Sequence, residues 1–197
     1  MINASSIVGR TEKVAFDFYE TPEWATQKVV EKLLEDGMID KNEDILEPCC
    51  GAGAITKVLK DNDFENVRSS DIQTADYIIG EKGVDVYNIG DGQCSTILTN
   101  PPYDLMTQGE KDGGSLLGEF LRIAKKKVIL LLNVYFLSSK KRKELLESSH
   151  IRHMYIHSDR VTMFPFGESS PKSNGTKMFI WVVWDKEYNG KPTFSFI

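Results

Sequence analysis

The chain has 197 residues, of which 41% are hydrophobic and 27% are charged, and its formal net charge is −5 at pH 7. This length and composition predict one soluble globular domain over residues 1–197, and they argue against a general polyanion binder, which would be strongly basic. No apolar run reaches the roughly 20 residues of a membrane helix, and residues 1–13 lack the apolar segment of a secretory signal. We therefore expect a cytoplasmic location without membrane contact.

The first predicted element is a helix over residues 21–37, where apolar residues recur at helical spacing. Thr21 suits its N-cap, Pro22 its first position and Gly37 its end. A short strand at 44–50 then leads into a glycine turn and a helix at 55–61. The later segments are predicted as strands at 66–72, 84–89 and 95–100, a helix at 115–126, a strand at 127–137, a helix at 139–149, and β-rich segments at 151–158 and 177–186, with Pro192 after them.

This order of elements predicts an α/β fold with three layers and an open, mostly parallel sheet. Strands that alternate with helices and are almost continuously apolar are typical of parallel strands buried on both faces. The last two strands have no helix between them, so we expect them to form an antiparallel pair. In such a sheet ligands bind at the carboxyl ends of the strands, where the loops after Pro48, Asp71, Tyr87 and Asn100 would meet.

The cysteines and histidines predict neither a disulfide framework nor a metal site. Cys49 and Cys50 are adjacent in the chain, and with only three cysteines in total we expect them to be packing residues. His150, His153 and His157 lie in a strand-like segment without an evident acidic or thiol partner.

Two lysine-rich clusters, at 124–127 and 140–143, stand out against the acidic balance of the chain. They suit either a local basic groove or the solvated ends of helices that flank a buried strand.

A glycine turn and two later aspartates indicate a nucleoside cofactor. Gly51 and Gly53 follow a strand and open a helix, which lets the backbone approach a ligand closely. Asp71 ends the next strand 20 residues after Gly51, the spacing at which an acidic residue binds ribose hydroxyls. Asp85 would then accept from an adenine amine, with Val86 and Tyr87 against the ring. Each feature alone also suits a tight turn or a strand-ending aspartate, but their order and spacing agree.

The segment NPPY, residues 100–103, follows the predicted strand at 95–100 and points to methyl transfer onto an amine. An exocyclic amine is a poor nucleophile because its lone pair is delocalised into the ring, and two acceptors can localise it. The Asn100 side-chain oxygen and the Pro101 carbonyl are suitable acceptors, held in place by the fixed φ of proline. Tyr103 would stack on a planar substrate. Alone, the segment also suits a proline-rich turn.

Together these segments resemble the S-adenosylmethionine-dependent amino-methyltransferases, and specifically the DNA adenine-N6 enzymes of the NPPY type with gamma-type motif order. The segment YETP at 19–22 resembles the motif that closes over the methionine end of the cofactor, and EPCCGAG at 47–53 resembles the glycine-loop motif. The resemblance implies cofactor-binding roles for Tyr19, Thr21, Pro22, Glu47, Pro48, Gly51, Gly53, Asp71, Ile72, Asp85, Val86 and Asn100, and catalytic roles for Asn100, Pro101, Pro102 and Tyr103.

The resemblance implies direct transfer of a methyl group to N6 of a flipped or unpaired adenine in DNA, with S-adenosylhomocysteine as the product. It also implies that an aromatic residue from a late loop binds the base together with Tyr103. Phe164 and Phe166 are the candidates, with Phe164 preferred, although both also suit a role as core residues that anchor the loop.

The chain departs from this family because it leaves no room for a target-recognition domain. Recognition of duplex or single-stranded DNA would then depend on the short loops at 104–115 and 167–176, on a homodimer or on a separate partner. The same chemistry also serves enzymes that methylate an amide in protein or a base in RNA. A binding module that retains the fold without turnover is the third interpretation.

Overall fold

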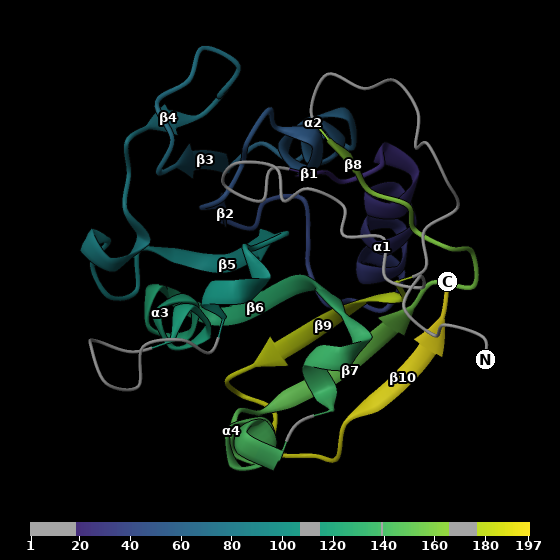
Figure 1. The fold of residues 1–197 in the computed structure, drawn as a ribbon. Coiled ribbons are helices and arrows are strands. Elements are labelled where there is room, and N and C mark those ends of the chain that lie inside the picture. The colour runs from purple at the N-terminus through teal and green to yellow at the C-terminus, as the bar shows by residue number, and fades with distance from the viewer. Residues whose placement is uncertain (1–18, 107–114, 139, 166–176) are drawn as a thin grey trace, which may run out of the picture.

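The computed structural model describes residues 19–106, 115–138, 140–165 and 177–197. Its centre is an eight-stranded sheet with the order β10-β7-β9-β6-β5-β2-β3-β4 (Figure 1). Its strands are β2 (Ile45–Glu47), β3 (Val67–Asp71), β4 (Glu81–Lys82), β5 (Cys94–Thr99), β6 (Ala124–Asn133), β7 (Ile151–Ile156), β9 (Phe179–Asp185) and β10 (Thr193–Phe196). The α-helices are α1 (Glu23–Glu35), α2 (Ala54–Asp61), α3 (Leu116–Ile123) and α4 (Lys143–Ser148).

The sheet is mostly parallel, as predicted. The strands β2 to β6 run parallel to one another, whereas β9 is antiparallel to both of its neighbours, β6 and β7. The antiparallel pair expected from the two last apolar segments is therefore confirmed. The edge strand β10, which is parallel to β7, was not predicted, because the predicted strands stop before Pro192.

Both faces of β6, in the middle of the sheet, are buried, because its successive residues enter two different apolar cores. Ile129 and Leu131 pack in the core that contains α1 and α2. Val128, Leu130 and Leu132 pack in the core that contains α3. Figure 1 shows α1 and α2 on one side of the sheet and α3 and α4 on the other, which makes the three predicted layers. No helix in the described ranges is long and apolar enough to cross a bilayer.

Several predicted details of the elements are wrong. The helix predicted over 115–126 ends at Ile123, and residues 124–126 already belong to β6. The segment 84–89 is not a strand: β4 ends before it, and Val86–Asn88 form a 3-10 helix because the Asp85 carboxylate accepts the N–H of Tyr87 at 3.0 Å. The strand at 127–137 ends at Asn133, whose side chain accepts the N–H of Tyr135 at 3.0 Å. The N-cap of α1 is Pro22, and no side chain caps this helix.

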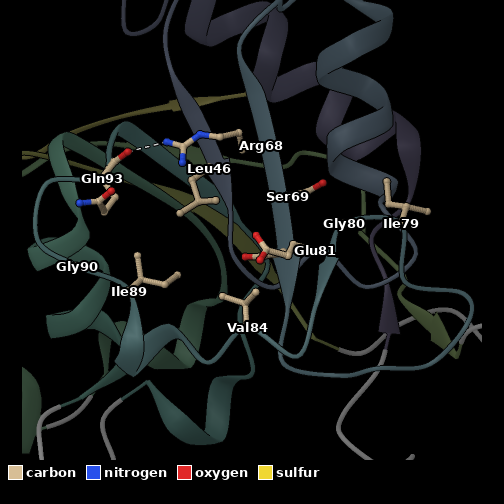
Figure 2. A pocket seen from close by; sticks show the side chains of 11 residues that line it. Leu46, Arg68, Ser69, Ile79, Gly80, Glu81, Val84, Ile89, Gly90 and Gln93 are labelled. Atoms are coloured by element: carbon tan, nitrogen blue, oxygen red, sulfur yellow. Dashed lines mark hydrogen bonds between the residues drawn. The ribbon is translucent and has the colours of Figure 1, made fainter.

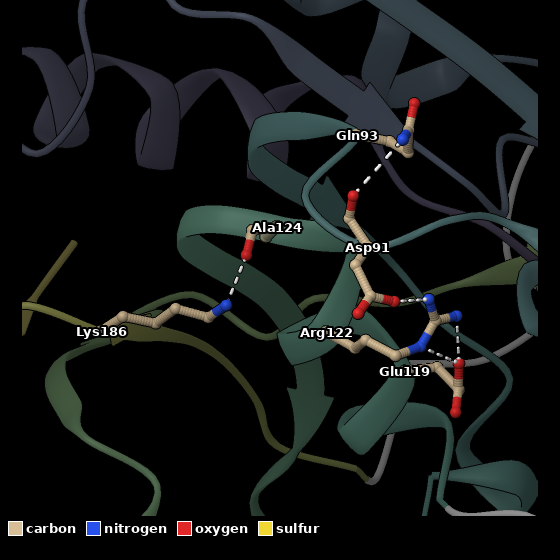
Figure 3. A network of polar contacts seen from close by, with 6 residues as sticks. All are labelled: Asp91, Gln93, Glu119, Arg122, Ala124 and Lys186. Atoms are coloured by element: carbon tan, nitrogen blue, oxygen red, sulfur yellow. Dashed lines mark hydrogen bonds and ion pairs between the residues drawn. The ribbon is translucent and has the colours of Figure 1, made fainter.

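A network of charged side chains fixes the loop before β5 to α3 at the amino edge of the sheet (Figure 3). The Arg122 guanidinium donates to Asp91 and to Glu119, and Lys186 donates to the Ala124 carbonyl at 2.6 Å. The lysine cluster 124–127 begins β6 at this same edge, opposite the carboxyl ends of the parallel strands.

The second basic cluster lies in the 3-10 helix Lys140–Arg142 and the start of α4. Arg142 in this cluster donates to the Phe136 carbonyl at 2.7 Å and to the Tyr135 carbonyl at 3.1 Å. Arg142 therefore holds the end of the 3-10 helix Val134–Leu137, which follows β6.

Candidate cofactor and substrate site

The predicted site residues gather at the carboxyl edge of the sheet, because the segments that carry them follow parallel strands. Pro48 follows β2, Asp71 ends β3, Asp85 follows β4, and Asn100 follows β5. Parallel pairing of these strands brings their carboxyl ends to one edge. The expected clustering of the loops is therefore present in the structure.

The glycine turn is bonded directly to the acidic residue of the next strand. Gly51 and Gly53 both have positive φ, at 50° and 80°, and Gly53 is the N-cap of α2. The Gly51 N–H donates to Asp71 Oδ2 at 2.9 Å, and the Gln73 N–H donates to Asp71 Oδ1 at 2.9 Å. Asp71 is buried, with 6% of its surface exposed. Each carboxylate oxygen still has a lone pair for a further donor.

Two ionisable side chains with raised pKa values, Glu47 and Cys50, lie next to this turn. Glu47 is buried and accepts both the N–H of Thr56, at 2.9 Å, and its hydroxyl. Burial raises the pKa of Glu47 to about 8, against the opposing effect of these hydrogen bonds. Burial likewise raises the pKa of the Cys50 thiol to about 11, so that this cysteine is protonated at neutral pH. Cys50 therefore packs beneath the turn and supplies no thiolate.

Two apolar side chains are exposed beside the glycine turn and Asp71. Ile72 is 60% exposed and Ile79 is 55% exposed. Ile79 lies over Gly53 so closely that a Cβ at Gly53 would be 2.0 Å from Ile79 Cδ1. Val86, by contrast, is buried in the core that contains α3. Ile79 was not predicted from the sequence as a residue of the site, because a single isoleucine in a loop belongs to no pattern.

An open cavity of about 480 Å³ lies on the face of the sheet and extends from the ends of β2 and β3 to the loop before β5 (Figure 2). Leu46, Ser70 and Val84 line it, and each directly precedes a predicted cofactor residue in the chain. Arg68 also lines it and donates to the Gln93 carbonyl at 2.6 Å. The described connection between β3 and β5 contains no α-helix, which leaves this part of the sheet face open.

Asn100 is the centre of a hydrogen-bonded cluster. Its Nδ2 donates to Thr21 Oγ1 at 3.1 Å and to Met163 Sδ at 3.6 Å. Its Oδ1 accepts the hydroxyl of Tyr103 at 2.7 Å. The Tyr103 ring packs against Phe179, with 6.2 Å between the ring centroids. The peptide bonds of this segment are trans, and Pro101 is buried while Pro102 is half-buried.

A small second sheet brings the segment 19–22 and the late loop to Asn100. β1 (Tyr19–Glu20) pairs antiparallel with β8 (Phe164–Pro165), so that Tyr19 lies opposite Pro165 and Glu20 opposite Phe164. Thr21 is buried beside Asn100 instead of capping α1. Phe166 and the loop 167–176 lie outside the described residues, as do residues 107–114 of the other predicted loop.

The comparisons with known proteins identify the fold. No family model matches the chain, and no curated protein matches it in sequence. Among solved structures, a protein assigned as an RNA methyltransferase from Pyrococcus horikoshii has a TM-score of 0.63 and 12% identity, over 95% of this chain and 94% of that one. A protein assigned as the modification subunit of a type I restriction enzyme from Vibrio vulnificus has a TM-score of 0.59 and 13% identity, over 91% of this chain.

The chain spans about half the length of that restriction subunit, since the match covers 47% of it. The magnesium protoporphyrin IX methyltransferase of Synechocystis with bound S-adenosylmethionine also matches, with a TM-score of 0.52 and 15% identity, over 82% of this chain and 79% of that one. The chain therefore has the class I fold of S-adenosylmethionine-dependent methyltransferases. At these identities the likeness concerns the fold alone.

Proposed function

We propose that the protein is an S-adenosylmethionine-dependent methyltransferase that methylates N6 of adenine in DNA. The observation that carries this proposal is the cluster around Asn100. The segments 19–22, 100–103 and the loop before β8 meet there through hydrogen bonds of the Asn100 amide. An amide so placed at the carboxyl end of β5 can accept a hydrogen of an exocyclic amine.

The residues at the adjacent strand ends fit the cofactor. Each oxygen of the buried Asp71 carboxylate keeps a lone pair for a ribose hydroxyl, and the backbone turn at Gly51 lets a ligand approach. Glu47 is a buried carboxyl that accepts its hydrogen bonds from Thr56, and burial raises its pKa to about 8. The ammonium of a bound amino acid group would favour the ionised form of this carboxyl and pair with it. Asp85 and the exposed Ile72 would hold the adenine end. When bound, S-adenosylmethionine supplies an electrophilic methyl group on a sulfonium.

The chain's own residues then prepare the nucleophile. Asn100 Oδ1 and the Pro101 carbonyl accept hydrogen bonds from the two N–H groups of the amine and so localise its lone pair. These acceptors act as preorganised electrostatic stabilisation. Tyr103 first gives up its hydrogen bond to Oδ1, and its ring then stacks on the base, which contributes about 1–3 kcal/mol. Phe164 is the first residue of β8 and directly follows Met163 in the chain. We propose Phe164 as the second base-binding residue.

The substrate has one serious alternative. The match to a protein assigned as a modification subunit of a restriction enzyme supports DNA as the substrate and a separate recognition partner. The match to a protein assigned as an RNA methyltransferase, which covers nearly the full length of both chains, supports an RNA base instead. Both substrates use the same acceptors at Asn100 and Pro101.

The deciding experiment is transfer of labelled methyl groups from S-adenosylmethionine to four pools in parallel: duplex DNA, single-stranded DNA, RNA and whole-cell protein. We expect N6-methyladenine in one of the DNA pools. Label in RNA or protein alone would replace the substrate and keep the chemistry. Saturable cofactor binding with no label in any pool would overturn the enzymatic proposal in favour of a binding module.

Asn100→Ala tests the catalytic role within the same assay. We expect methyl transfer to be lost while the Kd for S-adenosylmethionine stays within about threefold, because the cofactor contacts at Asp71 and Gly51 remain. Asn133→Ala is a matched control, since Asn133 ends the neighbouring parallel strand β6 and its side chain accepts the N–H of Tyr135 at 3.0 Å. Equal loss of transfer and cofactor binding in Asn100→Ala would contradict this role.

A further inference from the structure

The Asn100 amide has two ends that differ chemically, and only one of them can accept a hydrogen from an amine. In the structure its Nδ2 faces Thr21 Oγ1 at 3.1 Å and Met163 Sδ at 3.6 Å, and its Oδ1 faces the Tyr103 hydroxyl at 2.7 Å. Rotation of the amide by 180° would put a donor where the proposed chemistry requires an acceptor. Something in the site must therefore select the orientation.

The hydroxyl groups alone cannot make this selection. A threonine or tyrosine hydroxyl both donates and accepts, so Thr21 and Tyr103 could bond to either end of the amide. The thioether of Met163 has no hydrogen and acts only as a weak acceptor. With the amide inverted, Oδ1 would face Met163 Sδ, and two groups with lone pairs would meet. Met163 is thus the contact that distinguishes the two orientations, and Thr21 then accepts from the same Nδ2.

The backbone holds both residues against the amide. Thr21 directly follows β1 and Met163 directly precedes β8, and these two strands pair with each other. Thr21 is buried, with 5% of its surface exposed, and Met163 is half-buried against the core that contains α1 and α2. Water therefore competes little with either contact, and the β1–β8 pair sets their positions together.

We propose that Thr21 and Met163 are positioning residues that orient the Asn100 amide so that Oδ1 faces the substrate amine. This inference rests on the proposed amino-methyltransferase function and assigns a role to Met163, which sequence patterns did not single out. It also gives Thr21 a role other than contact with the cofactor. The Tyr103 hydroxyl occupies Oδ1 in the absence of the base and is replaced by the amine.

The first test is Met163→Leu, which nearly conserves volume and removes the sulfur acceptor. We expect kcat to fall about fivefold, which corresponds to ~1 kcal/mol in the barrier. The Kd for S-adenosylmethionine and the KM for the nucleic acid should stay unchanged. Thr21→Val should lower kcat further, and Thr21→Ser should restore it. Met38→Leu is the control, because Met38 is a buried methionine beyond the end of α1, away from the Asn100 contacts.

The second readout is one that a merely structural role would not move. Hypoxanthine carries an oxygen acceptor where adenine carries its amine, so an inverted amide would bind hypoxanthine through Nδ2–H. We compare the Kd of oligonucleotides that carry adenine or hypoxanthine at the methylated position. We expect the preference for adenine to be smaller in the double variant Thr21→Val/Met163→Leu than in the wild-type protein. The substrate is an oligonucleotide that the wild-type protein methylates.

The outcomes separate the two proposals. If the wild-type protein methylates no pool, the proposed function itself fails. If the wild-type protein is active but the double variant keeps the wild-type kcat and adenine preference, the positioning role is overturned. A Thr21→Val variant whose only defect is weaker cofactor binding would also overturn it and would return Thr21 to the cofactor contact.

Discussion

Asp71→Asn is the substitution that most directly tests the link between the acidic strand end and the glycine turn. Both oxygens of the Asp71 carboxylate accept backbone N–H groups at 2.9 Å, one from Gly51 and one from Gln73. Asparagine is nearly isosteric but offers a single acceptor oxygen, so its NH₂ group must face one of these two N–H donors. The variant therefore keeps the shape of the site and removes one charge-assisted bond.

The cost of this change follows from the burial of Asp71. A hydrogen bond to a charged group contributes about 1.5–3 kcal/mol, and an unsatisfied buried donor costs about 1–3 kcal/mol. Because part of these contributions overlaps, we expect a destabilisation of about 3 kcal/mol, which lowers Tm by roughly 6–12 °C in a chain of this size. The Asp71 carboxylate both holds the glycine turn and is the proposed contact of the ribose. We therefore also expect the affinity for S-adenosylmethionine to fall at least about tenfold.

The assay is thermal unfolding with and without S-adenosylmethionine, together with a titration of cofactor binding. The control is Asp40→Asn, because Asp40 Oδ1 accepts the N–H of Asn42 at 2.8 Å in an exposed turn. There we expect a change within about 0.5 kcal/mol. An Asp71→Asn variant with unchanged Tm would refute the proposed anchoring of the turn. An unchanged cofactor affinity would move the ribose contact to another residue.

Two further predictions concern conformation and pH. Gly53→Ala should destabilise the protein more than Gly37→Ala, because an added Cβ meets Ile79 at Gly53 but only open space at Gly37, where φ is +61°. In a double-mutant cycle measured by urea unfolding, Ile79→Ala should remove this difference in the free energy of unfolding. His157 accepts the Trp181 indole N–H at 3.1 Å, and burial lowers the pKa of His157 to about 4. Neutral His157 therefore confers stability above its unfolded pKa near 6.5, which is lost as the pH falls towards 4. Thermal unfolding across this range should show the loss, and His157→Gln, which keeps an acceptor, should reduce it; an identical pH profile in the variant would contradict this assignment.

The central part of the fold could be predicted because burial dominates its sequence. The run Val128–Leu132 is apolar at every position, and the structure buries it on both faces of the sheet. The helix α1 likewise shows apolar residues at helical spacing, and Gly37 with its positive φ ends it as expected. In these segments one physical effect outweighs the others, so local pattern and tertiary structure agree.

Prediction failed where side chains compete with the backbone pattern or where the contact is distant in the chain. Asp85 bonds to the N–H of Tyr87 and turns a strand-like segment into a 3-10 helix. The two-residue strands β1 and β8 are too short to show alternation, and their pairing joins residues far apart in the chain. Without that pairing nothing in the sequence connects Met163 with Asn100.

Tyr103 shows how the predicted and the observed site are related. Its motif position predicts an aromatic ring free to stack on a base, whereas in the structure the ring packs on Phe179 and the hydroxyl bonds to Asn100 Oδ1. Both states use the same two groups, because the base would take the ring face and its amine would take the oxygen. Entry of the base must therefore exchange one hydrogen bond for another at Asn100, and the acceptor remains satisfied before and after the exchange. The site can thus hold Asn100 in position without substrate and still leave its oxygen available to the amine.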